Sequence, residues 1–233
     1  MYEEKIIPPK KAMPQAQDGT LRKFALRVPE VIYQCSGIIV FGKRIKSLVF
    51  STDLSIIKNV NADAIIAVYP FTPQPIITQA LLLAADIPVF AGVGGGLTKG
   101  QRVVNLAMFA EMQGATGVVL NAPTASTVVS HVAETIDIPV VLTVARADTD
   151  FDARLQAGAN IFNVSAAAET PAIVRSIRER YPDVPIIATG GPTDESILET
   201  IQAGANAITW TPPTNGEIFR DIMAAYRDNK PHP

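Results

Sequence analysis

Two short signatures alternate along the chain and constrain its fold more than any other feature. One reads Asp-Ile/Val-Pro and begins at Asp86, Asp137 and Asp183; the other reads Gly-Ala-Thr/Asn and begins at Gly114, Gly158 and Gly204. Each stands directly before a short apolar run. A proline at the first residue of a strand loses no ladder hydrogen bond, and a glycine ends a helix in a left-handed conformation. The repeating unit is therefore a pair of strand–helix modules.

Apolar runs rich in Val, Ile, Leu and Ala recur along the chain with the same spacing as these signatures. We expect strands at Ser47–Ser51, Ala64–Tyr69, Pro88–Val93, Gly117–Asn121, Pro139–Val144, Asn160–Val164, Pro185–Thr189 and Ala207–Thr211. These runs do not alternate in polarity, which is typical of parallel strands covered on both faces. We expect helices at Leu54–Asn59, Pro75–Ala85, Gly100–Gln113, Ala125–Ile136, Phe151–Ala157, Thr170–Arg180, Asp194–Gln202 and Glu217–Arg227. Eight such units predict an α/β fold, a single (β/α)8 TIM barrel.

The first residues do not follow the repeat. Residues 1–36 are interpreted as an N-terminal arm with a short helix near Pro29–Gln34, and residues 37–233 as the barrel. Gly37–Gly42 is too short for anything but an extra strand or a plug at the bottom of the barrel. The arm and the apolar-rich barrel favour a homo-oligomer.

Composition excludes several classes of protein. Hydrophobic residues make up 48% of the chain and charged residues 18%, so a large core can be buried. The formal net charge is −2 without a basic block, which argues against nucleic-acid binding. No apolar run approaches the roughly 18 residues that a membrane span needs, so no membrane partner is expected. Cys35 is the single cysteine and the N-terminus lacks a signal-peptide pattern, so we expect a cytoplasmic protein.

Active sites of such barrels lie where strands end, and four ionisable residues there are candidates for chemistry. Asp53 and Glu169 are the candidates for proton transfer, with Lys99 and Arg146 as anchoring or electrophilic cations. Asp53 has an alternative role as the N-cap of the helix that begins at Leu54. Lys99 is the second-last residue of the glycine-rich stretch Ala91–Gly100 (AGVGGGLTKG), which is either a mobile lid or anion nest, or a flexible connection.

Arg146 has two alternative roles. It can clamp a carboxylate or phosphate of a ligand, or it can pair with a carboxylate of Asp148, Asp150 or Asp152. The alternating acids resemble a calcium loop only superficially, because no glycine or distant glutamate completes it. We therefore expect an acid here to cap the helix that begins at Phe151.

Polar residues inside apolar strands are candidate ligand contacts. Asn121 and Asn163 need hydrogen-bond partners, which either a ligand or the neighbouring backbone supplies. The sixth strand carries no lysine, which argues against a Schiff-base aldolase. His131 and His232 lie away from strand ends, so no metal site is expected.

The stretch PIIATGGPTDESILETIQAGANAI resembles the seventh and eighth units of the phosphate-binding aldolase-type TIM barrels. The chain is also loosely similar to antiterminator-type regulators of glycerol uptake. The first resemblance implies a phosphate held by backbone N–H groups after the seventh strand, at Thr189, Gly190 and Gly191. After the eighth strand the usual Gly-Ser or Gly-Thr is replaced by Thr211 and two prolines, which lack N–H donors. The remaining phosphate contacts are therefore expected at Thr211, Thr214, Asn215 and Gly216.

Three functions follow from these residues. The first is an enzyme that acts on a small phosphorylated metabolite as an isomerase, lyase or epimerase. The second is a sensor that binds a phosphorylated ligand and controls a partner without catalysis. The third is a flavin mononucleotide (FMN) oxidoreductase, although no cofactor is predicted from the residues themselves.

Overall fold

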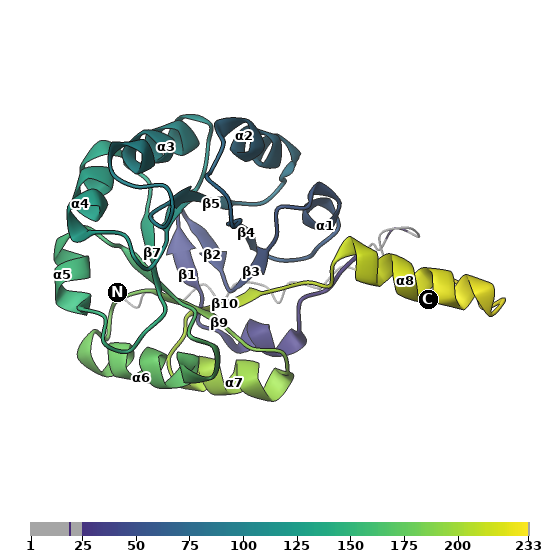
Figure 1. Ribbon diagram of the computed structural model, residues 1–233. Helices are drawn as coiled ribbons and strands as arrows, with labels where there is room; N and C mark the ends of the chain where they lie inside the picture. Colours follow the sequence, from purple (N-terminus) through teal and green to yellow (C-terminus); the bar gives the residue numbers. More distant parts are fainter. Residues whose placement is uncertain (1–18, 20–24, 233) are drawn as a thin grey trace, which may run out of the picture.

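The chain forms a closed barrel of eight parallel strands, which confirms the predicted architecture (Figure 1). This is a computed structural model, and it describes residue 19 and residues 25–232. The strands are β3 (Ser47–Phe50), β4 (Ala64–Ala67), β5 (Val89–Gly94), β6 (Gly117–Leu120), β7 (Val140–Val144), β8 (Ile161–Val164), β9 (Ile186–Thr189) and β10 (Ala207–Trp210). They pair in sequence order, and β10 closes the barrel by pairing with β3.

A helix follows each barrel strand. These helices are α1 (Leu54–Lys58), α2 (Pro75–Ala84), α3 (Gln101–Met112), α4 (Ser126–Thr135), α5 (Phe151–Gln156), α6 (Thr170–Arg180), α7 (Asp194–Gln202) and α8 (Asn215–Arg227). A short 3-10 helix, η3 (Ala167–Glu169), precedes α6. The helices α1 to α7 surround the barrel and cover its outer face, as Figure 1 shows. Among the described residues, no helix is long and apolar enough to cross a membrane.

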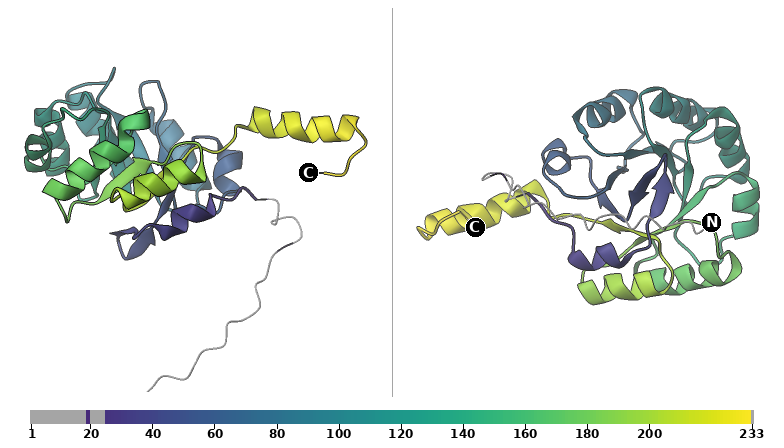
Figure 2. Two further views of the ribbon diagram at one scale, coloured as in Figure 1. Left: turned by 90° about the horizontal axis from the view of Figure 1, so that it is seen from below. Right: turned by 180° about the vertical axis from the view of Figure 1, so that it is seen from behind.

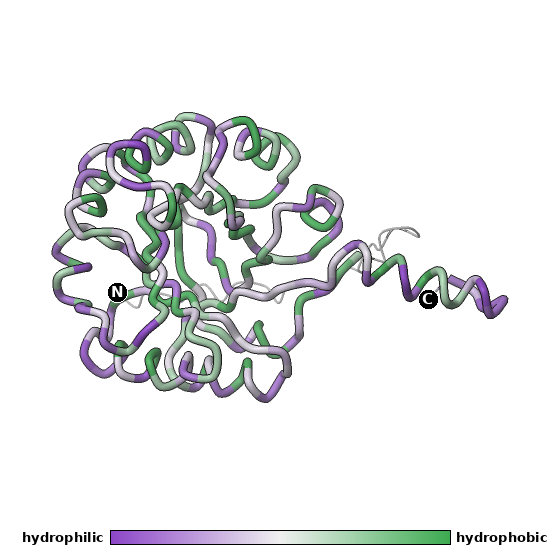
Figure 3. The backbone as a smooth tube through the Cα atoms, in the orientation of Figure 1, coloured by the Kyte–Doolittle hydropathy of each residue, from purple (hydrophilic) through white to green (hydrophobic). Residues whose placement is uncertain are grey.

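The continuous apolar runs give every strand two buried faces. One face points into the barrel, where Leu48, Ile66, Phe90 and Ile187 belong to an inner cluster. The other face belongs to a larger cluster between the strands and the helices. The strands are accordingly among the most hydrophobic parts of the chain in Figure 3.

The third residue of the Gly-Ala-Asn signature has a structural role at the bottom of the barrel. Asn160 Oδ1 accepts a hydrogen bond from Val140 N at 2.8 Å, and Asn206 Oδ1 accepts one from Ile186 N at 2.9 Å. At the start of β3, Asp63 Oδ2 likewise accepts hydrogen bonds from Lys46 N at 2.9 Å and Ser47 N at 3.0 Å. Each side chain thus satisfies a backbone donor at the start of the neighbouring strand, where the ladder has not begun. The signature is a stability feature of the scaffold.

A hairpin closes the bottom of the barrel, in agreement with the predicted extra strand or plug. Its strands are β1 (Ile38–Val40) and β2 (Lys43–Ile45), and they pair antiparallel. Ile38, Val40 and Ile45 point into the inner cluster. The second strand was not predicted. Before the hairpin lies a short 3-10 helix, η2 (Glu30–Gln34), which packs against α7. Most of the expected N-terminal arm lies outside the described residues.

The last helix departs from the barrel. Figures 1 and 2 show α8 projecting away from the ring that α1 to α7 form, although its expected boundaries hold within two residues. It follows the segment Thr211–Thr214, in which Pro212 and Pro213 hold the backbone extended. Sequence periodicity identified this helix but not its position.

Candidate functional site

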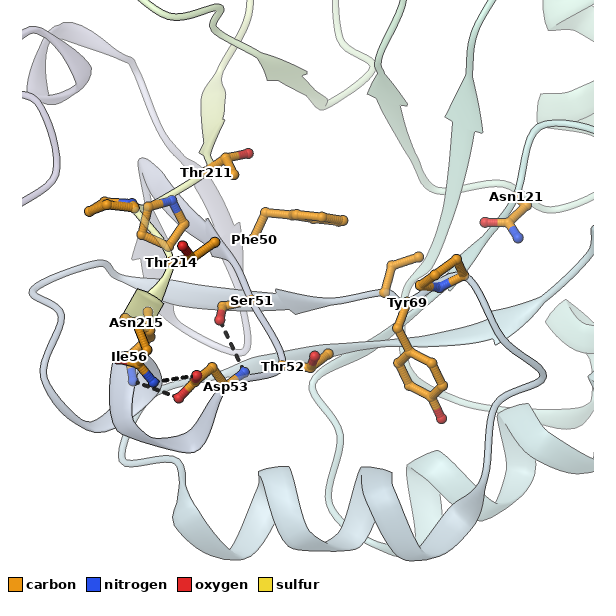
Figure 4. Close-up of a pocket in the computed structure, with 14 residues that line it drawn as sticks. Phe50, Ser51, Thr52, Asp53, Ile56, Tyr69, Asn121, Thr211, Thr214 and Asn215 are labelled. Carbon is orange, nitrogen blue, oxygen red and sulfur yellow. Dashed lines mark hydrogen bonds between the residues drawn. The ribbon is translucent and has the colours of Figure 1, made fainter. Parts of the chain in front are cut away.

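A pocket of about 590 Å³ opens at the carboxyl ends of the strands, and we call it the mouth pocket (Figure 4). Its polar lining consists of Ser51, Thr52, Asp53, Tyr69, Asn121, Thr211, Thr214 and Asn215. Its apolar lining consists of Phe50, Ile56, Val68, Pro70, Pro212 and Pro213. The volume lies within the usual range for small-molecule sites, and this end of the barrel is where such sites occur.

The top layer of side chains inside the barrel is divided into two halves. Because side chains alternate along a strand, the layer above the inner cluster can be assigned strand by strand. Phe50 on β3, Val68 after β4 and Gly92 on β5 make one half apolar. Four uncharged polar residues on β7 to β10 make the other half polar: Thr143, Asn163, Thr189 and Thr209. Asn121 lies between the halves.

Two buried atoms of the polar half lack a partner among the described residues. They are Asn163 Oδ1 and Thr209 Oγ1, on side chains that are 8% and 7% exposed. The Asn163 amide makes only a long contact, 3.5 Å from its Nδ2 to Thr143 Oγ1. Buried polar atoms are nearly always satisfied in native proteins. A water molecule or a ligand must therefore supply the missing hydrogen bonds.

Asp53 joins two helices at the edge of the mouth pocket. Its Oδ1 accepts hydrogen bonds from Ser55 N at 2.8 Å and Ile56 N at 3.3 Å, so it is the N-cap of α1. Its Oδ2 accepts from Asn215 Nδ2, the first residue of α8, at 2.5 Å. The hydrogen bond from the Ser55 hydroxyl is the main cause that lowers the pKa of Asp53, and the backbone bonds add to it. The carboxylate is thus ionised at neutral pH and is a weakened base.

The glycine-rich stretch is a tight turn packed against the next loop. Gly95 N donates to Thr98 O at 2.9 Å, and Asn121 N donates to Gly94 O at 2.9 Å. A Cβ on Gly95 would lie 1.8 Å from Thr124 Oγ1, so only glycine fits there. The loop also lines a small cavity with Tyr69 and Asn121, and the alternatives of a lid, an anion nest or a flexible connection stay predictions. Close backbone approach explains the glycine.

The other three ionisable candidates lie outside the mouth pocket. Lys99, Arg146 and Glu169 are exposed, and none of them lines it. Arg146 makes a two-point pair with Asp148, at 2.9 and 2.8 Å, which is the alternative role considered for it. That hydrogen-bonded pair raises the pKa of Arg146 and lowers the pKa of Asp148. Asp150 caps α5, as the sequence predicted for an acid in this segment.

The expected phosphate contacts are only partly brought together. Thr189, Gly191 and Thr211 line one cavity of about 410 Å³ between the ends of β9 and β10. Gly190 lines a pocket beside α7, and Thr214 and Asn215 line the mouth pocket. A Cβ on Gly190 would lie 2.7 Å from Ile197 Cγ1 and 2.8 Å from Ile208 Cγ2, so helix packing requires this glycine. Asp194 and Glu195 also place two carboxylates in the first turn of α7. Acidic residues at a helix N-terminus compete with a bound anion.

The start of α8 borders the mouth pocket. Thr214 and Glu217 form a capping box, with Thr214 Oγ1 accepting from Glu217 N at 3.2 Å and Glu217 accepting from Thr214 N at 2.8 Å. Asn215 and Gly216 follow Thr214 at the first positions of the helix, where backbone N–H groups have no intrahelical acceptor. This is the part of the predicted phosphate site that the fold brings to the pocket.

The apolar wall of the pocket was not predicted from the sequence. Polar residues at strand ends were singled out, but Phe50, Val68 and Pro212 were not. The alternation along each strand carries the missing signal, because Phe50 lies two residues beyond Leu48 in the inner cluster. Pro212 reaches the pocket only because β10 closes against β3.

Comparisons with known proteins identify the fold. No family model matches the chain, and no curated protein matches its sequence. Solved structures do match, and one is 2,3-dimethylmalate lyase, a member of the PEP mutase/isocitrate lyase superfamily. It has a TM-score of 0.61 and 13% identity, and the match covers 91% of this chain and 87% of that one. Phosphonopyruvate hydrolase in complex with oxalate and Mg²⁺ has a TM-score of 0.59 and 14% identity, over 80% of this chain and 84% of that one.

A third structure extends the comparison to another group of barrels. The 4-hydroxy-tetrahydrodipicolinate synthase of Methylacidiphilum fumariolicum SolV has a TM-score of 0.58 and 16% identity, over 81% of this chain and 75% of that one. The comparisons therefore identify the fold as a TIM barrel. At these identities the likeness establishes the fold alone. The resemblances to phosphate-binding barrels and to antiterminator regulators stay predictions.

Proposed function

We propose that this protein is an enzyme that binds a small metabolite in the mouth pocket and transforms it by proton transfer, as a lyase or isomerase. The observation that carries the proposal is the mouth pocket itself, about 590 Å³ with an apolar wall and a carboxylate at its edge. The named activities of its structural neighbours, a lyase, a hydrolase and a synthase, agree with this class of function. A cytoplasmic location remains our expectation.

Neutral groups hold the ligand in this proposal. No Lys, Arg or His is among the described residues that line the mouth pocket. Asn121 and Thr211 supply hydrogen bonds from the lining of the pocket, while Phe50 and Val68 cover the apolar part of the metabolite. The unsatisfied Asn163 Oδ1 and Thr209 Oγ1, which lie outside that lining, are proposed as further contacts. A phosphate group would meet the free backbone N–H groups of Asn215 and Gly216 at the start of α8. The carboxylates of Asp53 and Glu217 compete with an anion there, as Asp194 and Glu195 do at α7.

Asp53 is the proposed proton acceptor. Its Oδ1 is saturated by α1, but its Oδ2 accepts only from Asn215. Release of Asn215 would free this oxygen for a proton of the substrate. Glu169, Lys99 and Arg146 have no place in the proposal, because they lie outside the pocket.

The mouth pocket does not fit a magnesium ion held by protein carboxylates. Mg²⁺ takes six oxygen ligands and is usually held by one or two carboxylates together with water and substrate. Asp53 is the one carboxylate in the pocket lining, and both of its oxygens already accept hydrogen bonds. No group of three or more His, Cys, Asp or Glu side chains in the described part of the chain could hold a metal ion. The proposed steps therefore do not involve a metal.

Binding and turnover test the proposal separately. A panel of small phosphorylated and carboxylated metabolites is screened by thermal shift, and each stabilising compound is then followed by NMR for conversion. We expect stabilisation that Thr209→Val and Asn163→Leu reduce. The matched control is Thr170→Val, a buried threonine whose hydroxyl already accepts from Ala166 N at 3.0 Å and which lines neither the mouth pocket nor the pockets of Thr189 and Gly191.

The outcomes separate the alternatives. Conversion that Asp53→Asn abolishes supports the enzyme. Binding without conversion of any compound supports the sensor, which the saturated hydrogen bonding of Asp53 favours. A yellow protein, or stabilisation by added FMN, would favour the flavin enzyme. If Thr209→Val binds every compound as tightly as the wild type, the polar half of the mouth is not part of the site.

A further inference from the structure

The polar half of the top layer is the last layer of side chains inside the barrel. Its four residues are Thr143, Asn163, Thr189 and Thr209, on β7 to β10. On each strand the next inward position is exposed and belongs to the rim: Ala145, Ser165, Gly191 and Thr211. The layer beneath belongs to the buried inner cluster and is apolar: Val141, Ile161, Ile187 and Ala207. The polar half thus forms a hydrogen-bonding surface between the apolar core and the open mouth of the barrel.

This surface continues the lining of the mouth pocket. Phe50, Val68 and Asn121 line the pocket, and each lies two residues beyond a member of the inner cluster. The four polar residues also lie two residues beyond members of that cluster, so all seven side chains surround the same upper end of the barrel interior. A ligand that enters the mouth pocket and reaches the interior therefore meets the polar half.

The two unsatisfied oxygens of the polar half, Asn163 Oδ1 and Thr209 Oγ1, need a ligand group that donates a hydrogen bond. Both side chains are more than nine-tenths buried, and the oxygens themselves are covered. Rotation about the side-chain bonds turns each oxygen toward the mouth. The Asn163 oxygen is an acceptor only, whereas the Thr209 hydroxyl donates as well as accepts. A group that satisfies both must therefore carry a proton to donate.

A hydroxyl group fits this requirement better than a carbonyl or a carboxylate group. A hydroxyl donates to Asn163 Oδ1 and accepts from the Thr209 hydroxyl, whereas a carbonyl or carboxylate oxygen leaves Asn163 Oδ1 unsatisfied. An anionic group would also lose its hydration here without a countercharge. Among the described residues, no Lys, Arg or His belongs to the top layer or lines the mouth pocket.

The spacing of the two side chains favours a ligand with more than one hydroxyl group. Asn163 and Thr209 belong to β8 and β10, and β9 lies between these strands. Neighbouring strands are about 4.8 Å apart, so the two backbones are separated by roughly 10 Å. One hydroxyl beside each side chain fits this distance better than a single shared group. Thr189, on β9 between them, offers a third hydroxyl contact.

We propose that the polar half binds the hydroxylated end of a polyol or of a sugar derivative, and that any charged group of the same molecule stays at the solvent-exposed rim. Asn163 and Thr209 are then specificity-determining residues, because they select hydroxyl groups over carbonyl and carboxylate groups at the inner end of the site. The inference rests on the proposed function, since it assigns the substrate class of the same pocket.

Three compounds with the same phosphate group test this selection in calorimetric titrations of the full chain. Ribitol 5-phosphate carries a hydroxyl on every other carbon, ribulose 5-phosphate has a carbonyl at carbon 2, and ribonate 5-phosphate has a carboxylate at carbon 1. Ribitol 5-phosphate should bind most tightly. Ribulose 5-phosphate should bind about 2- to 10-fold more weakly, the effect of one lost hydrogen bond, and ribonate 5-phosphate more weakly still. Equal or tighter binding of either of these two, or no binding of all three at millimolar concentration, overturns the proposal.

The variants Thr209→Val and Asn163→Leu test which side chains cause the preference. Each should weaken the binding of ribitol 5-phosphate by about 2- to 10-fold and bring its affinity closer to that of ribulose 5-phosphate. The control Thr170→Val removes a buried hydroxyl outside the site and should leave both affinities unchanged. The ratio of the two affinities is the decisive readout, because a merely structural role does not change it. A ratio that neither variant alters refutes the assignment of these residues.

Turnover of each bound compound is followed by NMR in parallel, so that the two proposals fail separately. Binding with a preference for hydroxyl groups but without conversion contradicts the enzyme and supports the assigned substrate class. Conversion of a carbonyl or carboxylate compound that binds as tightly as its hydroxyl counterpart supports the enzyme and overturns the assigned class.

Discussion

Replacement of Gly95 by alanine tests the packing of the glycine-rich turn. Gly95 has a φ of +102°, in the left-handed region that favours glycine. The added Cβ would lie 1.8 Å from Thr124 Oγ1 and 3.0 Å from Thr124 Cβ, so the Thr124 side chain must move. That movement breaks its hydrogen bond to Asn121 O, which is 2.6 Å long.

The cost follows from these two effects. A left-handed conformation costs a residue with a Cβ about 1–2 kcal/mol. Loss of the Thr124 hydrogen bond costs about 0.5–1.5 kcal/mol. Together Gly95→Ala should lower the free energy of unfolding by about 1.5–3.5 kcal/mol, which for a chain of this size is a fall in Tm of roughly 3–14 °C.

The matched control is Gly96→Ala, in the next residue of the same turn. Its added Cβ would meet Asn121 Nδ2 at 3.4 Å, an ordinary van der Waals contact. Thermal unfolding followed by circular dichroism should separate the two variants clearly. Thr124→Ala removes the closest atom, so the double variant Gly95→Ala/Thr124→Ala should lose less stability than the sum of the single losses. Equal Tm values for Gly95→Ala and Gly96→Ala would refute the reasoning.

Three further predictions concern single side chains. Thr209→Val should leave the stability of the ligand-free protein unchanged or raise it, whereas Thr200→Val should cost about 1 kcal/mol in urea unfolding, because only the Thr200 hydroxyl has a partner. Asn206→Ala should cost about 2–3 kcal/mol, since it removes the acceptor of Ile186 N and of the Arg178 guanidinium. Asn59→Ala, which removes one exposed hydrogen bond from Asn59 Nδ2 to Ser55 O, should cost less, and the reverse order would contradict this. The pKa of Asp53 is lower in the folded protein than in the unfolded chain, where it is about 3.9. The ionised carboxylate therefore stabilises the folded protein fully at pH values above about 3.9, and this stabilisation is lost as the pH falls through the folded pKa. The Tm difference between the wild type and Asp53→Asn should therefore be present at neutral pH and close in acid, and a difference that persists in acid would argue against this role of the carboxylate.

The sequence by itself determined the barrel. The alternating signatures located six of the barrel strands, and the apolar runs located the first two, because apolar runs, prolines at strand starts and helix caps are local features. The N-caps at Asp53 and Asp150 and the pair between Arg146 and Asp148 were among the alternatives for the same reason. Each depends on residues within a few positions of one another.

Only the tertiary structure decided which strand ends form one pocket and where the last helix lies. Asp53 and Asn215 are 162 positions apart, and they meet because β10 pairs with β3. The same closure brings Pro212 to the mouth pocket, whereas Gly190 lines a pocket beside α7. The periodicity of α8 identifies a helix, but it does not encode where that helix lies. Local sequence patterns specify elements, whereas the site depends on contacts between residues that are distant in the chain.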